Sequence, residues 1–137
     1  MAHSDYSFPK SDRLCSHTLI NQLFAEGKSF VCYPFRVVYK KSNLPDPIHS
    51  QVLFSVSKKR FKRAVMRNLL KRRCREAYRL NREEFASFLT QNNQQITFAL
   101  VYIAREELGY SVIEKGIKKT LTKLQLSLNK NSNHATD

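Results

Sequence analysis

Half of the basic residues of this 137-residue chain are concentrated in one short segment. Lys58 to Arg82 contains 12 of the 24 Lys and Arg residues and a single acid, Glu76. Arg presents a planar fork of donors that matches two phosphate oxygens at once, and Lys meets phosphate as a point charge. Such a concentration of like charge costs stability unless a polyanion binds to it. The chemistry available to these residues is therefore phosphate recognition.

The spacing of the charges predicts a helix with two different sides. From Ala64 to Leu80 there is no Gly or Pro, and most residues favour helix. Apolar residues recur on one side, and basic residues four apart form a ridge on the other. The apolar side holds Met66, Leu70, Cys74, Ala77 and Tyr78; the ridge holds Arg63, Arg67, Lys71, Arg75 and Arg79, with Asn68 and Arg72 beside it. A solvated surface helix normally interleaves Glu with Lys, and this ridge has no acid, so we expect it to bind a partner.

The expected partner is a nucleic acid, since the chain carries a formal net charge of +13. A helix that lies on a membrane needs Trp, Phe and Leu on the apolar side of a free helix, whereas the apolar side here is modest and includes Ala and Cys, which suits packing on a sheet. No apolar run is long enough to span a bilayer, and the N-terminus lacks the apolar core of a signal peptide. Cys15, Cys32 and Cys74 are far apart and show no zinc-binding spacing, which favours reduced thiols and a cytoplasmic location.

The sequence predicts no catalytic residue and no metal ligand in the protein itself. Water activation needs clustered carboxylates holding a metal, or a His with a partner. The acidic pairs, Glu83-Glu84 and Glu106-Glu107, are adjacent residues that do not face one site, and neither His17 nor His49 has the context of a catalytic dyad. Three scattered glycines cannot build a phosphate-cradling loop.

The remaining pattern predicts a single α+β domain, a β-sheet packed with about three helices. Ser16 is a candidate N-cap and Gly27 a candidate stop for a first helix. Strands are expected over residues 30–41, 51–57 and 96–104, and a last helix begins at the capping box formed by Ser111 and Glu114. The order strand, basic helix, strand predicts a crossover that makes the last strand parallel to an earlier one. Within the domain, 1–137, we expect an ordered core over about 9–128 and flexible ends over 1–8 and 129–137.

Residues Phe54 to Arg79, FSVSKKRFKRAVMRNLLKRRCREAYR, resemble the signature of the protein subunit of bacterial ribonuclease P. In that family a strand ends in S-V-S-K-K and, after a spacer, A-V-x-R-N-x-x-K-R-x-x-R-E follows. The matching positions are Ser55 to Lys59, Ala64, Val65, Arg67, Asn68, Lys71, Arg72, Arg75 and Glu76. Arg13-Leu14, Phe24 before Gly27, and V-Y-I-A-R at Val101 to Arg105 also agree, so the resemblance covers roughly residues 9–128.

The resemblance implies a role in a ribonucleoprotein endoribonuclease that removes the 5′ leader from precursor tRNA. In this family a catalytic RNA subunit holds the Mg²⁺ ions and cuts the phosphodiester bond. The protein binds that RNA through its basic helix and contacts the leader in a cleft between the sheet and the first helix. The family fold has a mixed sheet and a left-handed βαβ crossover, as in some ribosomal small-subunit proteins. Neither a membrane nor DNA is an expected partner.

Carried onto this sequence, the family's sites give two groups of residues. The expected RNA-binding residues are Lys58, Lys59, Arg60, Lys62, Arg63, Arg67, Asn68, Lys71, Arg72, Arg75 and Arg79. The expected leader-cleft residues are Phe24, Tyr39 and Phe54, whose rings would stack on leader bases.

One departure from the family pattern concerns the middle of the basic helix. The family often has a third basic residue after Arg-Asn, where this chain has Leu69, and often has Leu where this chain has Arg73. The two positions are four apart and neighbours on the helix. We interpret them as a swap that moves one guanidinium along the helix by a turn.

Two other classes of protein fit the composition. A ribosomal protein would share the size, charge and build but have no processing role, and the matched motif argues against it. A DNA-binding regulator would need a helix-turn-helix and a dimer surface, and neither is visible in the sequence.

Overall fold

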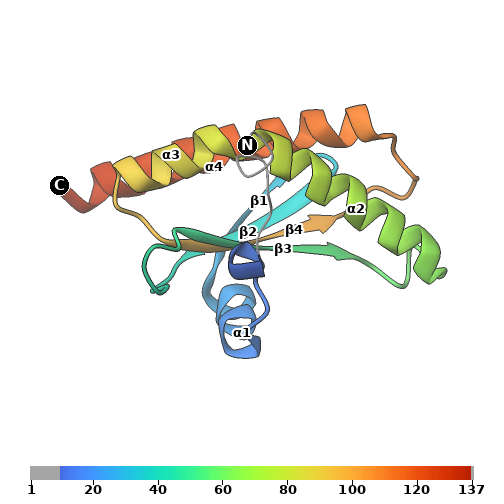
Figure 1. Cartoon of the computed structure of the whole chain (residues 1–137), viewed down its shortest axis with the longest axis horizontal. Helices are drawn as coiled ribbons and strands as arrows, with labels where there is room; N and C mark the ends of the chain where they lie inside the picture. Colours follow the sequence, from blue (N-terminus) through green and yellow to red (C-terminus); the bar gives the residue numbers. More distant parts are fainter. Residues whose placement is uncertain (1–9, 137) are drawn as a thin grey trace.

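The protein is a four-stranded sheet with helices on both faces (Figure 1). The computed structural model describes the backbone of residues 10–136 and the side chains of residues 10–129. In chain order the elements are η2 (Lys10–Asp12), α1 (His17–Glu26), β1 (Lys28–Cys32), β2 (Phe35–Lys41), β3 (Ser50–Val56), α2 (Ala64–Asn81), α3 (Glu83–Gln91), β4 (Ile96–Tyr102) and α4 (Tyr110–Thr136).

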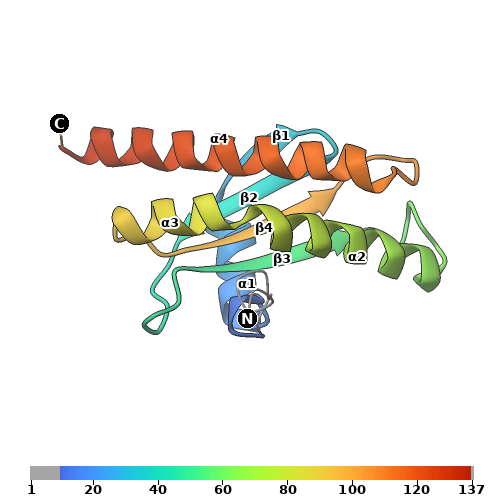
Figure 2. The same ribbon diagram turned by 45° about the horizontal axis from the view of Figure 1, so that its top comes forward.

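The sheet is mixed and has the strand order β1-β2-β4-β3. Strands β1 and β2, and β2 and β4, are antiparallel, whereas β3 and β4 are parallel and joined through α2 and α3. Figure 2 looks onto these helices, with β3 and β4 pointing to the right and β4 above β3. A connection in front of the sheet in that arrangement is left-handed, whereas about 98% of such crossovers are right-handed. The predicted α+β class and mixed sheet are confirmed.

Four α-helices are present in the described residues, rather than about three. The extra one is α3, which lies between α2 and β4. Arg82 ends α2 and begins α3 with φ −83° and ψ −16°, and Phe85 and Leu89 of α3 are buried. These two apolar anchors, four residues apart, are enough to dock a short helix.

The main core lies between the sheet and the layer formed by α2, α3 and α4. Phe98 of β4 is at its centre, with ring centroids 6.0 Å from Tyr78 of α2 and 5.7 Å from Phe85 of α3. Phe54 of β3 lies 5.9 Å from the Tyr78 ring. All three pairs are edge-to-face, the arrangement that aromatic quadrupoles favour. These contacts fix α2 on the β3 side of the sheet.

Helix α1 packs alone on the opposite face of the sheet, over a smaller core that includes Leu23, Val38 and Ala99. Ser16 caps the helix as predicted, because its hydroxyl accepts the Leu19 N–H at 3.3 Å. Gly27 ends the helix, also as predicted. A Cβ at Gly27 would lie 2.4 Å from the Leu23 carbonyl oxygen and 2.9 Å from Val38, so only glycine allows this close approach.

Helix α4 begins at Tyr110, so Ser111, the predicted capping residue, lies within the helix. The predicted capping box is wrong: the Glu114 carboxylate accepts hydrogen bonds from Asn81 (3.0 Å) and the Tyr110 hydroxyl (3.3 Å). The helix continues to Thr136, and residues 1–9 lie outside the described part, so the limits of the ordered core stay a prediction. None of the helices in residues 10–136 combines the length and apolarity that crossing a bilayer requires.

Candidate nucleic-acid interface

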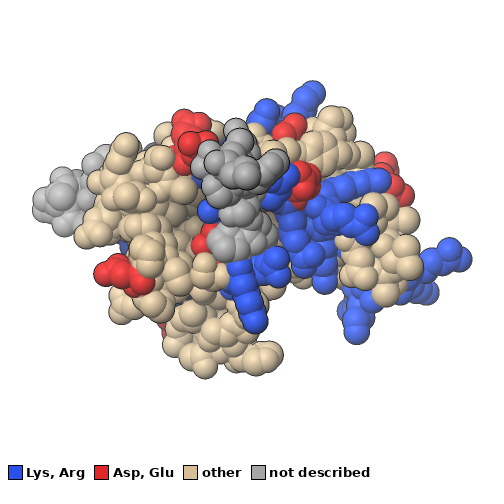
Figure 3. Space-filling view, viewed as in Figure 1, with Lys and Arg blue, Asp and Glu red and all other residues tan. Residues whose placement is uncertain are grey.

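Helix α2 displays the predicted basic ridge on the outside of the molecule. Its inner side contributes Leu70, Cys74, Ala77 and Tyr78 to the main core. Burial raises the pKa of the Cys74 thiol to about 12, so this cysteine is inert at neutral pH. Figure 3 shows Lys and Arg side chains gathered over α2 and over the connection that leads into it. The predicted helix and its two sides are therefore confirmed.

We call the predicted RNA-binding residues together the α2 surface. Eight of its members are exposed, and the other three are half-buried. The exposed members are Lys58, Lys59, Arg60, Lys62, Arg63, Asn68, Arg72 and Arg75; the half-buried ones are Arg67, Lys71 and Arg79. Arg75 and Arg72 point away from the core, so their guanidinium groups are open to a phosphate backbone. That these residues contact RNA stays a prediction.

The first turn of α2 adds backbone donors to the same surface. Arg63 is the N-cap residue and makes no side-chain capping bond, and the first turn contains no acid. The first N–H groups of a helix lack intrahelical partners and carry the positive end of its dipole. Lys62 and Arg63 stand beside them, so both side chains and backbone favour an anion at this point.

Three arginines of the α2 surface also brace the protein. Arg67 donates from Nη1 to the carbonyl oxygens of Phe61 and Lys62, both at 2.8 Å. Arg60 donates to the Ile103 carbonyl oxygen, and Arg79 pairs with Glu76. The hydrogen bond that Arg79 donates to the Glu76 carboxylate raises the pKa of the Arg79 guanidinium. These arginines hold the β3–α2 connection and α2 in shape while their positive charge remains part of the surface.

The face of the sheet that α1 covers is only partly hidden. Helix α1 lies over the cross-strand row Val38, Ala99 and Leu53. The next row toward the carboxyl ends of β3 and β4 remains open, and we call it the open strip. It consists of Val31, Arg36, Val101 and Ser55, paired across the four strands. Val31 and Arg36 are exposed, and Val101 and Ser55 are half-buried.

Helix α1 turns one aromatic ring toward this open strip. Leu19 and Gln22 line a pocket on the other flank of α1. Phe24 lies on the opposite flank at helical spacing and is 48% exposed. Lys58 and Lys59 follow the end of β3, next to the strip. An exposed ring, an arginine and two lysines thus border one stretch of sheet surface, the combination that binds single-stranded nucleic acid.

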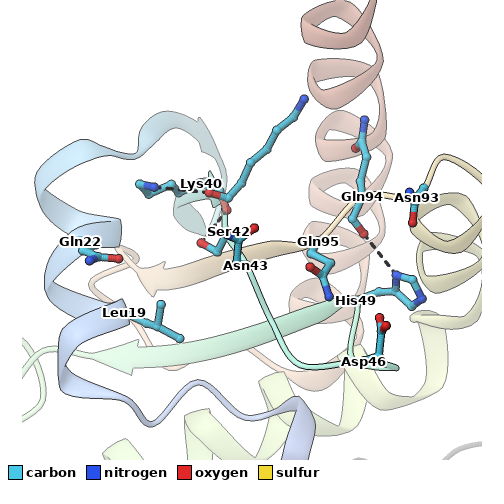
Figure 4. Close-up of a pocket in the computed structure, with 11 residues that line it drawn as sticks. Leu19, Gln22, Lys40, Ser42, Asn43, Asp46, His49, Asn93, Gln94 and Gln95 are labelled. Carbon is cyan, nitrogen blue, oxygen red and sulfur yellow. Dashed lines mark hydrogen bonds between the residues drawn. The ribbon is translucent and has the colours of Figure 1, made fainter.

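The pocket on the other flank of α1 has a volume of about 570 Å³ and is mainly polar (Figure 4). The Gln95 amide fixes the loop above it by donating to Leu44 and Ile48. His49 lies 3.3 Å from the Gln94 carbonyl oxygen and has no hydrogen bond to Asp46 among the described contacts. The described side chains also contain no group of three His, Cys, Asp or Glu that could hold a metal ion. The pocket contains none of the predicted site residues.

The model of the family described as Ribonuclease P matches residues 8–125. The chain belongs to the ribonuclease P protein family. It is 40% identical over 119 residues to the ribonuclease P protein component of Porphyromonas gingivalis, covering 87% of each chain, and 30% identical over 131 residues to that of Chlorobium phaeobacteroides, covering 88% and 90%. The fold is similar to that of the Staphylococcus aureus RNase P protein (TM-score 0.64, 20% identity, 84% and 95% covered) and that of Thermotoga maritima (0.62, 21%, 81% and 96%).

At the departure from the ribonuclease P pattern, Arg73 makes contacts within the protein. Arg73 Nη1 donates to the Leu108 carbonyl oxygen at 2.8 Å and pairs with Glu107 at 3.0 Å. Arg73 is thus turned toward the β4–α4 connection and holds it against α2. That the two positions represent a guanidinium moved along the helix by a turn stays a prediction, and in this structure the Arg73 guanidinium is held by the β4–α4 connection.

The expectation that Tyr39 and Phe54 line a cleft with Phe24 is also wrong. Both rings are 7% exposed and belong to the main core, on the face of the sheet away from α1. Tyr39 packs against Phe30 at 6.0 Å, and Phe54 packs against Tyr78. Alternate residues of a strand point to opposite faces, so Phe35, Val37 and Tyr39 all turn to the larger core.

The residues that the sequence reasoning missed are Arg36, Ser55 and Val101 of the open strip. The sequence of β2 could have indicated this exposed face, because Arg36 stands between two buried apolar residues. A charged residue between buried apolar residues of a strand marks the face that meets solvent or a polar partner. Phe24 is the one predicted leader residue that the structure places at this face.

Proposed function

We propose that this chain is the protein subunit of ribonuclease P, which removes the 5′ leader from precursor tRNA in the cytoplasm. The observation that carries the proposal is the α2 surface: the motif that resembles the family's signature stands on a helix whose outer side is basic and exposed. The proposed partner of this surface is the catalytic RNA subunit, whose phosphates would meet Arg72, Arg75 and Lys71.

Catalysis belongs to the RNA in this proposal. The described side chains supply no cluster of three metal-ligating residues, and we assign the catalytic Mg²⁺ mainly to the RNA subunit. The protein contributes charge: the segment that contains α2 offsets the repulsion between the RNA subunit and the precursor tRNA. It thereby strengthens substrate binding and lowers the Mg²⁺ concentration that the complex needs.

The proposed path of the leader is the open strip beside α1. Arg36 faces a phosphate, Phe24 offers a ring for a base to stack on, and Val101 forms the apolar floor between them. Base stacking on an exposed aromatic ring contributes about 1–3 kcal/mol and tolerates any sequence. The strip ends next to Lys58 and Lys59, where the α2 surface begins, so one protein can touch both RNAs at once.

The test is reconstitution of the enzyme from purified parts. RNA-free protein, ribonuclease P RNA and precursor tRNA are mixed over a range of Mg²⁺ concentrations, and release of the 5′ leader is followed. We expect no cleavage by the protein alone, and cleavage by the RNA at a lower Mg²⁺ concentration when the protein is present.

Two outcomes would contradict the proposal. Cleavage by rigorously RNA-free protein would place an active site in the protein. If the RNA subunit needs the same Mg²⁺ concentration with and without the protein, this chain is not its partner. Co-purification with ribosomal subunits instead of a processing RNA would favour a ribosomal protein.

A further inference from the structure

Helix α4 presents a second cationic surface, built from lysines. Its buried side is apolar and includes Ile113, Ile117 and Leu124, so the opposite side faces solvent. That side carries Lys115, Lys118, Lys119 and Lys123, all exposed, and we call these four residues the α4 surface. Glu114, the only acid in residues 110–129, is engaged by Asn81 and Tyr110.

The α4 surface and the α2 surface stand over opposite edges of the sheet. Lys123 Nζ lies 4.9 Å from the ring centroid of Phe30, a residue of edge strand β1. Helix α2 packs on β3, the other edge strand. Three strand spacings of about 4.8 Å separate those edges by about 14 Å. Figure 3 likewise shows a smaller group of basic side chains over α4, apart from the main group.

The lysines of α4 repel one another. Lys115 and Lys119, and Lys119 and Lys123, are four residues apart, and Lys115 and Lys118 are three apart. Like charges at these spacings destabilise a helix. None of the salt bridges within residues 10–129 involves a member of the α4 surface. A helix that concentrates uncompensated charge in this way is suited to a polyanionic partner.

We propose that the α4 surface binds the phosphate backbone of a second segment of the catalytic RNA, separate from the segment at the α2 surface; this inference rests on the proposed function. Lysine is a point charge on a flexible stem, which suits backbone contacts without base readout. The open strip proposed for the leader is on the other face of the sheet, so the leader is kept away from α4. Within residues 110–129, α4 exposes only two large apolar side chains, Val112 and Leu126, which is too little for a lipid surface.

The first test is the salt dependence of binding to the RNA subunit. The variant is Lys115→Gln with Lys119→Gln, and the matched control is Lys10→Gln with Lys41→Gln, two exposed lysines outside both surfaces. Each lost phosphate contact lowers the slope of log affinity against log salt by about 0.9. Between about 50 and 200 mM salt, the wild type should therefore lose about tenfold more affinity than the variant. The control should behave as the wild type does.

The second test is a hydroxyl-radical footprint of the RNA subunit in the assembled complex. Lys115→Gln with Lys119→Gln should expose one RNA segment, and Arg72→Gln with Arg75→Gln a different one. The proposal is overturned if the α4 variant keeps the wild-type slope, if both variants expose the same nucleotides, or if the α4 variant weakens only precursor tRNA binding. Wild-type protein that fails to support cleavage would instead contradict the proposed function. Thermal melting should show the α4 variant to be as stable as the wild type or more so.

Discussion

The guanidinium of Arg67 lies 2.8 Å from the carbonyl oxygen of Phe61, six residues before it, and ties the start of α2 to the connection that leaves β3. Arg75, two turns further along the ridge, points to solvent instead. Arg67 therefore helps to shape the ridge, whereas Arg75 only extends from it. Substitutions at the two positions should have different effects.

Arg67→Ala removes hydrogen bonds from a charged donor to two carbonyl oxygens, so it should lower the free energy of unfolding by about 1–3 kcal/mol as well as weaken RNA binding. Arg75→Ala should leave stability within about 0.5 kcal/mol of the wild type and lower the salt slope of RNA binding by about one unit. Urea unfolding and a salt series of RNA titrations measure the two effects. An Arg75→Ala protein with an unchanged slope would remove Arg75 from the interface.

The open strip predicts a leader-specific defect. Phe24→Ala removes a ring that is 48% exposed, and it should weaken binding of precursor tRNA to the assembled enzyme by about 1–3 kcal/mol while leaving mature tRNA unaffected. Arg36→Gln should act in the same direction. The measurement is the affinity for both substrates. Leu126→Ala, an exposed residue on the other side of the molecule, is the control, and equal weakening of both substrates by Phe24→Ala would refute the leader path.

Tyr39→Ala should behave as a core mutation and not as a binding mutation. The ring is 7% exposed and packs against Phe30, so its loss leaves a cavity that should cost about 3–5 kcal/mol of folding stability. Chemical unfolding measures that loss. A Tyr39→Ala protein with wild-type stability and a selective loss of leader binding would restore Tyr39 to the leader site.

The sequence predicted α2 almost to the residue because a run without Gly or Pro, with apolar residues at helical spacing, leaves little choice of local structure. It did not predict which face of the sheet α1 covers. Alternation in β2 shows that Phe35, Val37 and Tyr39 share a face. Both faces of this sheet carry a core, however, and these three residues belong to the larger one. The contacts of Arg73 could not be predicted for a similar reason, since its partner Glu107 is supplied by a distant connection.

Buried Tyr78 predicts a loss of stability at high pH. Burial raises the pKa of its hydroxyl from 10.0 to about 12, so the folded state holds the proton where the unfolded state has lost it. The unfolded state then binds fewer protons, and stability falls as the pH rises from about 10 to 12, by up to about 3 kcal/mol. Urea unfolding at increasing pH measures this, and Tyr78→Phe should flatten the decline. An equally steep decline in Tyr78→Phe would assign it to other groups.

Adjacent residues of α2 offer the sharpest test of how the helix divides its charges between the protein and RNA. Arg73 binds Leu108 and Glu107, whereas Arg72 is exposed on the outer side. Arg73→Gln should free the β4–α4 connection and speed hydrogen exchange in residues 105–109, with a stability loss of about 1 kcal/mol because the pair is partly exposed. Its salt slope for RNA binding should equal that of the wild type.

Arg72→Gln removes the same charge from the neighbouring position and should give the opposite result. Its stability and hydrogen exchange should match the wild type, and its salt slope should fall by about one unit. Because the two variants have the same net charge, a long-range charge effect would lower both slopes equally. Equally lowered slopes would therefore contradict this division of the charges, because Arg73 would then contribute to RNA binding as much as Arg72 does.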